Sequence, residues 1–136
     1  MDSRRKNSVI IIHLDTNVLI DLSTQGSAAG DKVEKWLEEG RVLAASSTVW
    51  FEYISGPVPA DALGLALAAL QGGILPFDSH QAEKAAELYN LTGRRRALRF
   101  DCMIAAGAII ANATLATSNG ADFLMFVPFG LKLEVV

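Results

Sequence analysis

Continuous apolar runs alternate along the chain with segments whose apolar residues recur three or four positions apart. The first run, residues 9–14, is rich in β-branched side chains, which is typical of a strand buried on both faces. Shorter runs predict three more strands at residues 42–45, 74–77 and 114–117. Residues 131–135 alternate between apolar and polar side chains, which indicates a fifth strand at the edge of the sheet.

Helices are predicted between these strands from spacing and from capping residues. They cover residues 18–22, 31–39, about 47–54 after a cap at Ser46 or Ser47, 61–71, 79–89 after a cap at Asp78 or Ser79, and 101–112. The last of these is very apolar, so we expect it to be buried. Strands that alternate with helices indicate a mostly parallel sheet with helices on both faces. We therefore expect one α/β domain over residues 1–136, a three-layer α/β/α sandwich around four to five strands, with a flexible N-terminus at residues 1–7.

Composition agrees with a single folded domain. Of 136 residues, 51% are hydrophobic and 20% are charged, which argues against disorder. The net charge of −3 neither predicts nor excludes nucleic acid, because a local basic patch matters more than the total. No apolar stretch has the length of a membrane span, and one cysteine cannot form an internal disulfide. We therefore expect a cytoplasmic protein with no membrane association.

Four acidic residues stand beside apolar runs. Asp15 follows the first strand, Glu52 lies in the helix after the second, Asp101 opens the apolar helix, and Asp122 comes just past the fourth strand. Ligands of open α/β sheets bind beyond the carboxyl ends of the strands, and all four acids can reach that edge. Carboxylates that meet there repel one another and favour a hard divalent cation such as Mg²⁺ or Mn²⁺. The pattern therefore favours metal-dependent phosphodiester chemistry.

The segments around these acids resemble those of PIN-domain nucleases, and among them the small VapC-type toxin ribonucleases. The matching segments, in order, are Leu-Asp-Thr-Asn-Val-Leu-Ile-Asp at 14–21, Glu52 in a Ser/Thr-capped helix, Asp-Cys-Met-Ile-Ala-Ala at 101–106, and Thr-Ser-Asn-Gly-Ala-Asp-Phe at 117–123. Together they extend over nearly the whole chain. Each segment alone is common, whereas all four in this order are fairly specific.

The resemblance implies an acidic pocket that binds one or two Mg²⁺ or Mn²⁺ ions and hydrolyses RNA through a metal-activated water. It also implies a homodimer and a VapB-like antitoxin as partner. The metal-binding and catalytic residues it implies are Asp15, Glu52, Asp101 and Asp122, and the supporting polar residues are Asn119, Thr16 and Thr117. The chain departs from many relatives at residues 93–100, which are more basic, and this departure concerns the choice of substrate.

Each acid also has a simpler interpretation. Asp15 and Asp101 could be helix caps, Glu52 could face solvent, and Asp122 could cap the turn after Asn119. Two further residues near these acids are expected to belong to the core. They are His13, expected with satisfied hydrogen bonds, and Cys102.

Arg94, Arg95, Arg96 and Arg99 form a basic cluster just before Asp101. Such a cluster could attract a phosphate backbone to an acidic metal site. It could equally hold an acidic segment of an antitoxin, or be a solvated run of charge.

Three other functions compete with a toxin ribonuclease. The chain could be a non-catalytic α/β binding module, or a PIN nuclease of RNA processing that has no antitoxin. A phosphatase with an aspartate nucleophile is the third, but its usual second aspartate is missing because position 17 is Asn17.

Overall fold

A five-stranded, wholly parallel sheet forms the centre of the molecule, in a computed structural model that describes residues 9–136. The predicted flexible segment at residues 1–7 lies outside the described residues. The strands are β1 (Ile11–Leu14), β2 (Val42–Ser46), β3 (Ile74–Leu75), β4 (Thr114–Thr117) and β5 (Lys132–Val135). Their order is β3-β2-β1-β4-β5, and every neighbouring pair is parallel. The predicted mostly parallel sheet is thus confirmed, with β5 at its edge.

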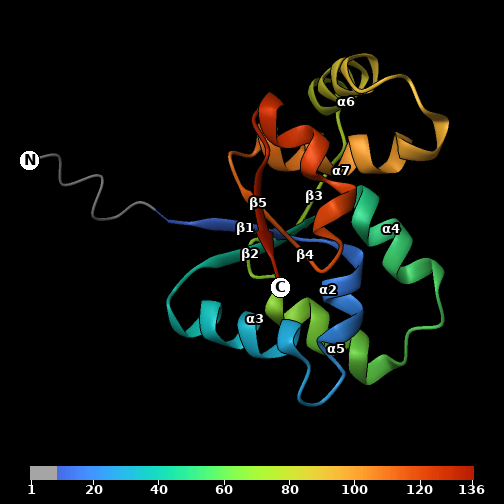
Figure 1. The fold of residues 1–136 in the computed structure, drawn as a ribbon. Helices are drawn as coiled ribbons and strands as arrows, with labels where there is room; N and C mark the ends of the chain where they lie inside the picture. Colours follow the sequence, from blue (N-terminus) through green and yellow to red (C-terminus); the bar gives the residue numbers. More distant parts are fainter. Residues whose placement is uncertain (1–8) are drawn as a thin grey trace, which may run out of the picture.

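Helices cover both faces of the sheet. They are α2 (Thr16–Asp21), α3 (Ala28–Glu38), α4 (Ser47–Ser55), α5 (Ala60–Ala69), α6 (Ser79–Leu91) and α7 (Arg99–Ile110), with short 3-10 turns η1 (Arg96–Leu98), η2 (Gly120–Asp122) and η3 (Leu124–Phe129). Figure 1 shows α6 and α7 on one side of the strands and α3 and α5 on the other. This arrangement is the predicted three-layer α/β/α sandwich. Within the described residues, no helix is both long enough and apolar enough to cross a bilayer.

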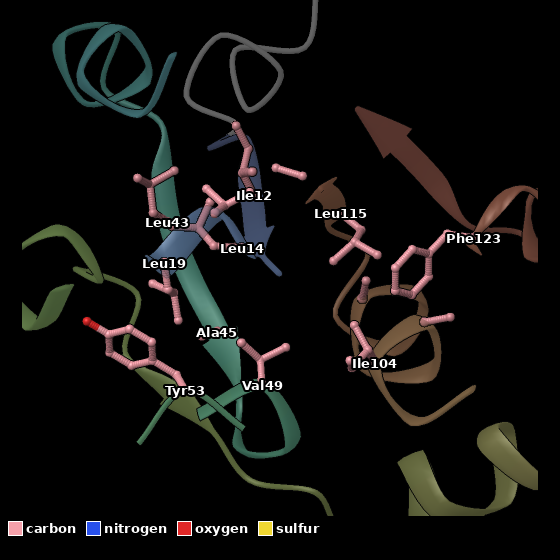
Figure 2. Packing of buried hydrophobic residues seen from close by; sticks show 14 of the residues in the cluster. Ile12, Leu14, Leu19, Leu43, Ala45, Val49, Tyr53, Ile104, Leu115 and Phe123 are labelled. Carbon is pink, nitrogen blue, oxygen red and sulfur yellow. The ribbon is translucent and has the colours of Figure 1, made fainter. Parts of the chain in front are cut away.

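The core lies where the inner strands meet the helices. Ile12 and Leu14 of β1, Leu43 of β2 and Leu115 of β4 are almost completely buried. Figure 2 shows these side chains with others of the same cluster. Because β1 and its two neighbours are covered on both faces, their sequences are continuous apolar runs rather than alternating ones.

The predicted first strand was too long at its start. Val9 and Ile10 are 56% and 52% exposed, although both are apolar and belong to the run that predicted a buried strand. The ladder with β2 begins at Ile11, and before it only the Ile10 carbonyl accepts a hydrogen bond, from the backbone N–H of Val42, so β1 begins two residues later than predicted. Hydrophobicity alone cannot show where the neighbouring strand begins.

Capping side chains set most helix starts. Ser46 caps α4, because its Oγ accepts a hydrogen bond from the backbone N–H of Val49. Asp78 caps α6 in a capping box with Gln81. Both caps agree with the prediction.

Two other helices begin earlier than predicted. The helix predicted from residue 31 begins three residues earlier, because Ser27 caps it. The helix predicted from Asp101 begins at Arg99, with Leu98 as its N-cap, so Asp101 does not cap it.

The order of the strands reverses between β1 and β4. From β1 the chain moves to β2 and β3 on one side, and β4 and β5 lie on the other. A crevice opens at such a reversal, beyond the carboxyl ends of the two strands. Leu14 pairs with Ala116 at this end, which places Asp15 beside Thr117.

Candidate active site

Asp15 is held at the end of β1 by both of its carboxylate oxygens. Its Oδ1 accepts a 2.8 Å hydrogen bond from the backbone N–H of Thr16, so Asp15 is also the N-cap of α2. Its Oδ2 accepts hydrogen bonds from Thr117 Oγ1 (2.8 Å) and Asn17 Nδ2 (3.2 Å). The cap interpretation and the site interpretation therefore describe the same side chain. Burial raises the pKa of Asp15, and these hydrogen bonds oppose that rise.

Asn17 joins the ends of β1 and β4 and is missing from the predicted site. Its Nδ2 reaches Thr117 Oγ1 (3.3 Å) as well as Asp15, and its Oδ1 accepts from both the backbone N–H and the Oγ of Ser118 (3.0 Å each). These contacts bridge about one hundred positions of sequence. The available signal was an amide two residues after an aspartate at a strand end. That signal alone does not distinguish a local cap from a bridge between strands.

Glu52 enters the site from α4, where Thr16 orients it. The side chain is half-buried, and its Oε1 accepts a 3.1 Å hydrogen bond from Thr16 Oγ1. Burial raises the pKa of Glu52, and the negative charge of Asp15 raises it further. The supporting role predicted for Thr16 therefore has a specific partner in the structure. Glu52 does not simply face solvent.

Asp101 lies in the first turn of α7, where the helix N-terminus favours negative charge. Its pKa is nevertheless raised to about 6. Burial is the largest cause, followed by the negative charges of Asp122, Asp15 and Glu52. Among residues 9–136 no hydrogen-bond donor opposes this rise. Apart from the N-terminus of α7, no group among the described residues thus offsets the negative charge of the Asp101 carboxylate.

Asp122 is supplied by the turn after β4. It ends η2, is exposed, and lines the same pocket as Asn119. Gly120 allows this turn to lie against β5, because a Cβ at that position would overlap Cγ2 of Val135. The Asn119 backbone N–H donates to Thr117 Oγ1 (3.0 Å), which links the turn to the network around Asp15. The side chain of Asp122 does not cap η2.

One pocket of about 250 Å³ brings the four predicted acids together. Its lining consists of Asp15, Thr16, Asn17, Ile20, Glu52, Asp101, Ile104, Asn119, Asp122 and Phe123. Thr117 is not part of this lining, but its Oγ1 donates a hydrogen bond to Asp15, which is. Residues that are far apart in the sequence therefore form one acidic site at the carboxyl ends of β1 and β4.

The donor set suits a divalent cation that retains water. Within residues 9–136, no three Asp, Glu, His or Cys side chains are arranged to hold a metal ion on their own. The four carboxylates line the pocket but do not converge closely enough to coordinate one ion by themselves. Mg²⁺ commonly binds to one or two carboxylates, retains several waters and takes further oxygens from a phosphate. The all-oxygen donors and the uncompensated charge at Asp101 fit an ion of this kind.

Comparison with known families identifies the domain. A model of the PIN domain matches residues 12–125. The chain belongs to the PIN-domain family. The resemblance predicted from the four motifs is thereby confirmed. No curated protein sequence matches the chain.

Solved structures share the fold of this PIN domain. VapBC2 from Rickettsia felis, bound to a DNA fragment from its promoter, matches with a TM-score of 0.70 and 23% identity over 93% of this chain and 98% of that chain. VapBC-1 from nontypeable Haemophilus influenzae gives a TM-score of 0.71 and 17% identity, with the same coverage. A toxin–antitoxin complex from Klebsiella pneumoniae gives 0.62 and 26%, over 83% of this chain and 90% of that chain.

The basic cluster does not line the acidic pocket of this PIN domain. Arg96 and Arg99 line a separate groove of about 360 Å³ between α6 and α7, whose other residues are mainly apolar. Arg94 donates to Asn90 Oδ1, and Arg95 contacts the sulfur of Met125. The turn after α6 and the short η1 carry these side chains away from the pocket. The predicted rim directly over the acids is therefore absent from the lining.

The two predicted core residues near the acids have different outcomes. Cys102 is buried, as expected. His13 is only 2% exposed, but its Nε2 has no hydrogen-bond partner among the described residues. The prediction of a satisfied histidine is wrong, because β1 is covered on both faces by apolar side chains. Burial lowers the pKa of His13 to about 4, so the ring is neutral at pH 7.

Proposed function

We propose that this PIN domain is a metal-dependent endoribonuclease and the toxin of a type II toxin–antitoxin pair. The observation that carries the proposal is the pocket itself. Four carboxylates border it, and burial, followed by the charges of the other three, raises the pKa of Asp101 to about 6. Such a site binds a divalent cation more readily than a neutral ligand. RNA phosphodiester hydrolysis is the chemistry implied by the family.

The residues of the pocket have separate roles in this proposal. Asp15 and Asp101 would be the direct ligands of Mg²⁺ or Mn²⁺, and Glu52 and Asp122 would hold the ion directly or through water. A bound ion would lower the pKa of the attacking water and offset charge on the phosphate. Thr117 and Asn17 fix the orientation of Asp15, and Thr16 fixes that of Glu52. Groups that orient a ligand in this way commonly affect metal affinity.

The test is an RNA cleavage assay with the purified protein. We expect cleavage with Mg²⁺ or Mn²⁺ and none with EDTA. Full activity in EDTA would exclude a metal mechanism. Complete inactivity with every ion and every RNA tried would favour a non-catalytic binding module.

We further propose an antitoxin of the VapB type and a homodimer, both acting in the cytoplasm. The support is the shared fold with the VapBC structures from Rickettsia felis and Haemophilus influenzae. A gene for a small DNA-binding protein beside this one would identify the partner to test. Co-expression should then give a complex in which RNA cleavage is suppressed. Light scattering on the protein alone tests the homodimer.

A further inference from the structure

Two phenylalanine rings stack on each other at the surface, and each directly precedes an acid of the pocket in sequence. Phe51 of α4 and Phe100 of α7 have ring centroids 6.3 Å apart and planes inclined by only 16°. They are 58% and 47% exposed. By contrast, Phe123 and Phe126 form a tilted pair at a similar distance and are almost fully buried. An aromatic pair that only supported the fold would not need to leave so much apolar surface in water.

The position of the pair links it to the site. Phe51 immediately precedes Glu52, and Phe100 immediately precedes Asp101. Successive residues of a helix point about 100° apart, so each helix can direct its acid into the pocket and its ring to the border. The helices α4 and α7 contact each other (Figure 1), which brings the two rings together. Each ring therefore directly precedes an acid that lines the pocket, while the rings themselves lie outside the pocket lining.

We propose that Phe51 and Phe100 form a stacking platform for an unpaired base of the RNA next to the scissile phosphate. This inference rests on the proposed RNA substrate and names how that substrate is held. Every nucleobase has a flat π-face, and proteins that bind single strands stack bases on exposed aromatic side chains. A base-paired duplex cannot offer such a face, so the platform would select single-stranded RNA.

The charges around the pair favour RNA over a second protein surface. Glu52 and Asp101, which directly follow the two rings in sequence, line the acidic pocket, whereas the exposed Arg99 directly precedes Phe100 and lines the groove between α6 and α7. Among residues 9–136 no carboxylate forms a salt bridge with Arg99, so it can attract a phosphate. The centre of a protein–protein interface is usually depleted of charged residues. A small aromatic patch whose residues are next in sequence to a cation and to acids suits a nucleotide better.

The first experiment compares variants that keep or remove the rings. In F51L/F100L the apolar side chains remain while both π-faces are lost, and in F51Y/F100Y the rings remain. L67A removes a similarly exposed side chain from α5 as a surface control. Binding to a short single-stranded RNA is measured in EDTA, and KM for its cleavage is measured in Mg²⁺. We expect the leucine pair to bind about ten-fold more weakly, and the tyrosine pair and L67A to match the parent.

A second comparison tests whether a base is the group contacted. An RNA of the same length with abasic positions keeps every phosphate but offers no base. We expect the parent to bind it as weakly as the leucine pair binds intact RNA, and the leucine pair to lose little more. Loss of rings should leave the salt dependence of binding unchanged, because no phosphate contact is removed.

Several outcomes would overturn the inference. One is a leucine pair that binds intact RNA like the parent. Another is a further loss of affinity when F51L/F100L binds abasic instead of intact RNA, by the same factor that the parent loses. A loss of RNA binding that only accompanies dissociation of a dimer, seen by sedimentation at the assay concentration, would assign the rings to a second copy of the chain. If the parent itself neither binds nor cleaves RNA, the proposed function fails as well.

Discussion

The two sides of the acidic pocket are built differently. On the side of the strands, Asp15 accepts hydrogen bonds from Thr16, Asn17 and Thr117. On the side of α7, Asp101 accepts none from the described residues, and burial together with the neighbouring acids raises its pKa to about 6. Hydrogen bonds thus partly offset the charge of Asp15, although burial still raises its pKa, whereas no hydrogen bond from the described residues offsets that of Asp101. The proposed ligand Asp15 is therefore held in a fixed orientation, and Asp101 supplies a negative charge that a cation would neutralise.

The largest expected effect is on catalysis, where both sides should be needed. Asp15→Asn and Asp101→Asn should each reduce the rate of RNA cleavage by more than about 100-fold, because loss of an orienting group alone can reach that factor. Asp21→Asn is the matched control, since Asp21 ends α2 outside the pocket lining. Initial rates on a labelled RNA measure the effect. Near-normal turnover by either pocket variant would remove that residue from the proposed ligands.

The second largest effect is expected on stabilisation by metal, which should differ between the parent and Asp101→Asn. A ligand that binds only the folded state stabilises it by about 2.7 kcal/mol at one hundred times its Kd. Mn²⁺ at millimolar concentration should therefore raise the Tm of the parent and of Asp21→Asn, and raise that of Asp101→Asn much less. Thermal melts with EDTA and with Mn²⁺ measure the difference. An equal gain in all three would mean that Asp101 is not part of a metal site.

Without metal, the two aspartates should respond to the same substitution with opposite signs. Asn at position 101 removes an uncompensated charge, so the variant should melt above the parent in EDTA. Asn at position 15 would turn an N–H donor toward the donors that now reach Asp15, which costs about 1–3 kcal/mol when buried. That variant should melt below the parent. Shifts of the same sign would contradict the proposed difference between the two sides.

A smaller effect is expected in the pH dependence of the free energy of unfolding. The folded pKa of Asp101, about 6, lies above its ordinary value of 3.8. The folded state therefore binds the proton more tightly, and the parent loses stability relative to Asp101→Asn as the pH rises from about 4 to about 6. The Tm difference in EDTA should grow over that range and stay constant above it. If the Tm difference does not change with pH, its cause is not the titration of Asp101.

His13 does not disturb this comparison. Burial lowers its pKa to about 4, so it destabilises the folded state as the pH falls through a similar range. That contribution has the opposite sign, but it is the same in both proteins and cancels in their difference.

The smallest expected effect concerns the basic cluster just before and at the start of α7. Replacing Arg95, Arg96 and Arg99 with alanine should weaken RNA binding and reduce the salt slope by up to about two, if each contacts one phosphate of a single strand. Cleavage at saturating RNA should change little, because these side chains do not line the acidic pocket. An unchanged slope would leave the cluster as a solvated run of charge.

The sequence by itself determined the class of fold and the acids of the site. Continuous apolar runs can be buried only in covered strands, and an acid directly after such a run must lie at a strand end. Asp15 follows from that local rule, and Glu52, Asp101 and Asp122 were candidates because they also stand beside apolar runs. The PIN motifs then implied metal-binding and catalytic roles for all four.

Only the tertiary structure decided which groups meet. Asn17 contacts Thr117 across one hundred residues, His13 lacks a partner, and the arginines lie beside the α6–α7 groove instead of the acids. The stacking of Phe51 on Phe100 likewise depends on how α4 and α7 pack. Periodicity is a local property of the chain. Hydrogen-bond partners and exposure depend on elements distant in sequence, and packing alone brings those together.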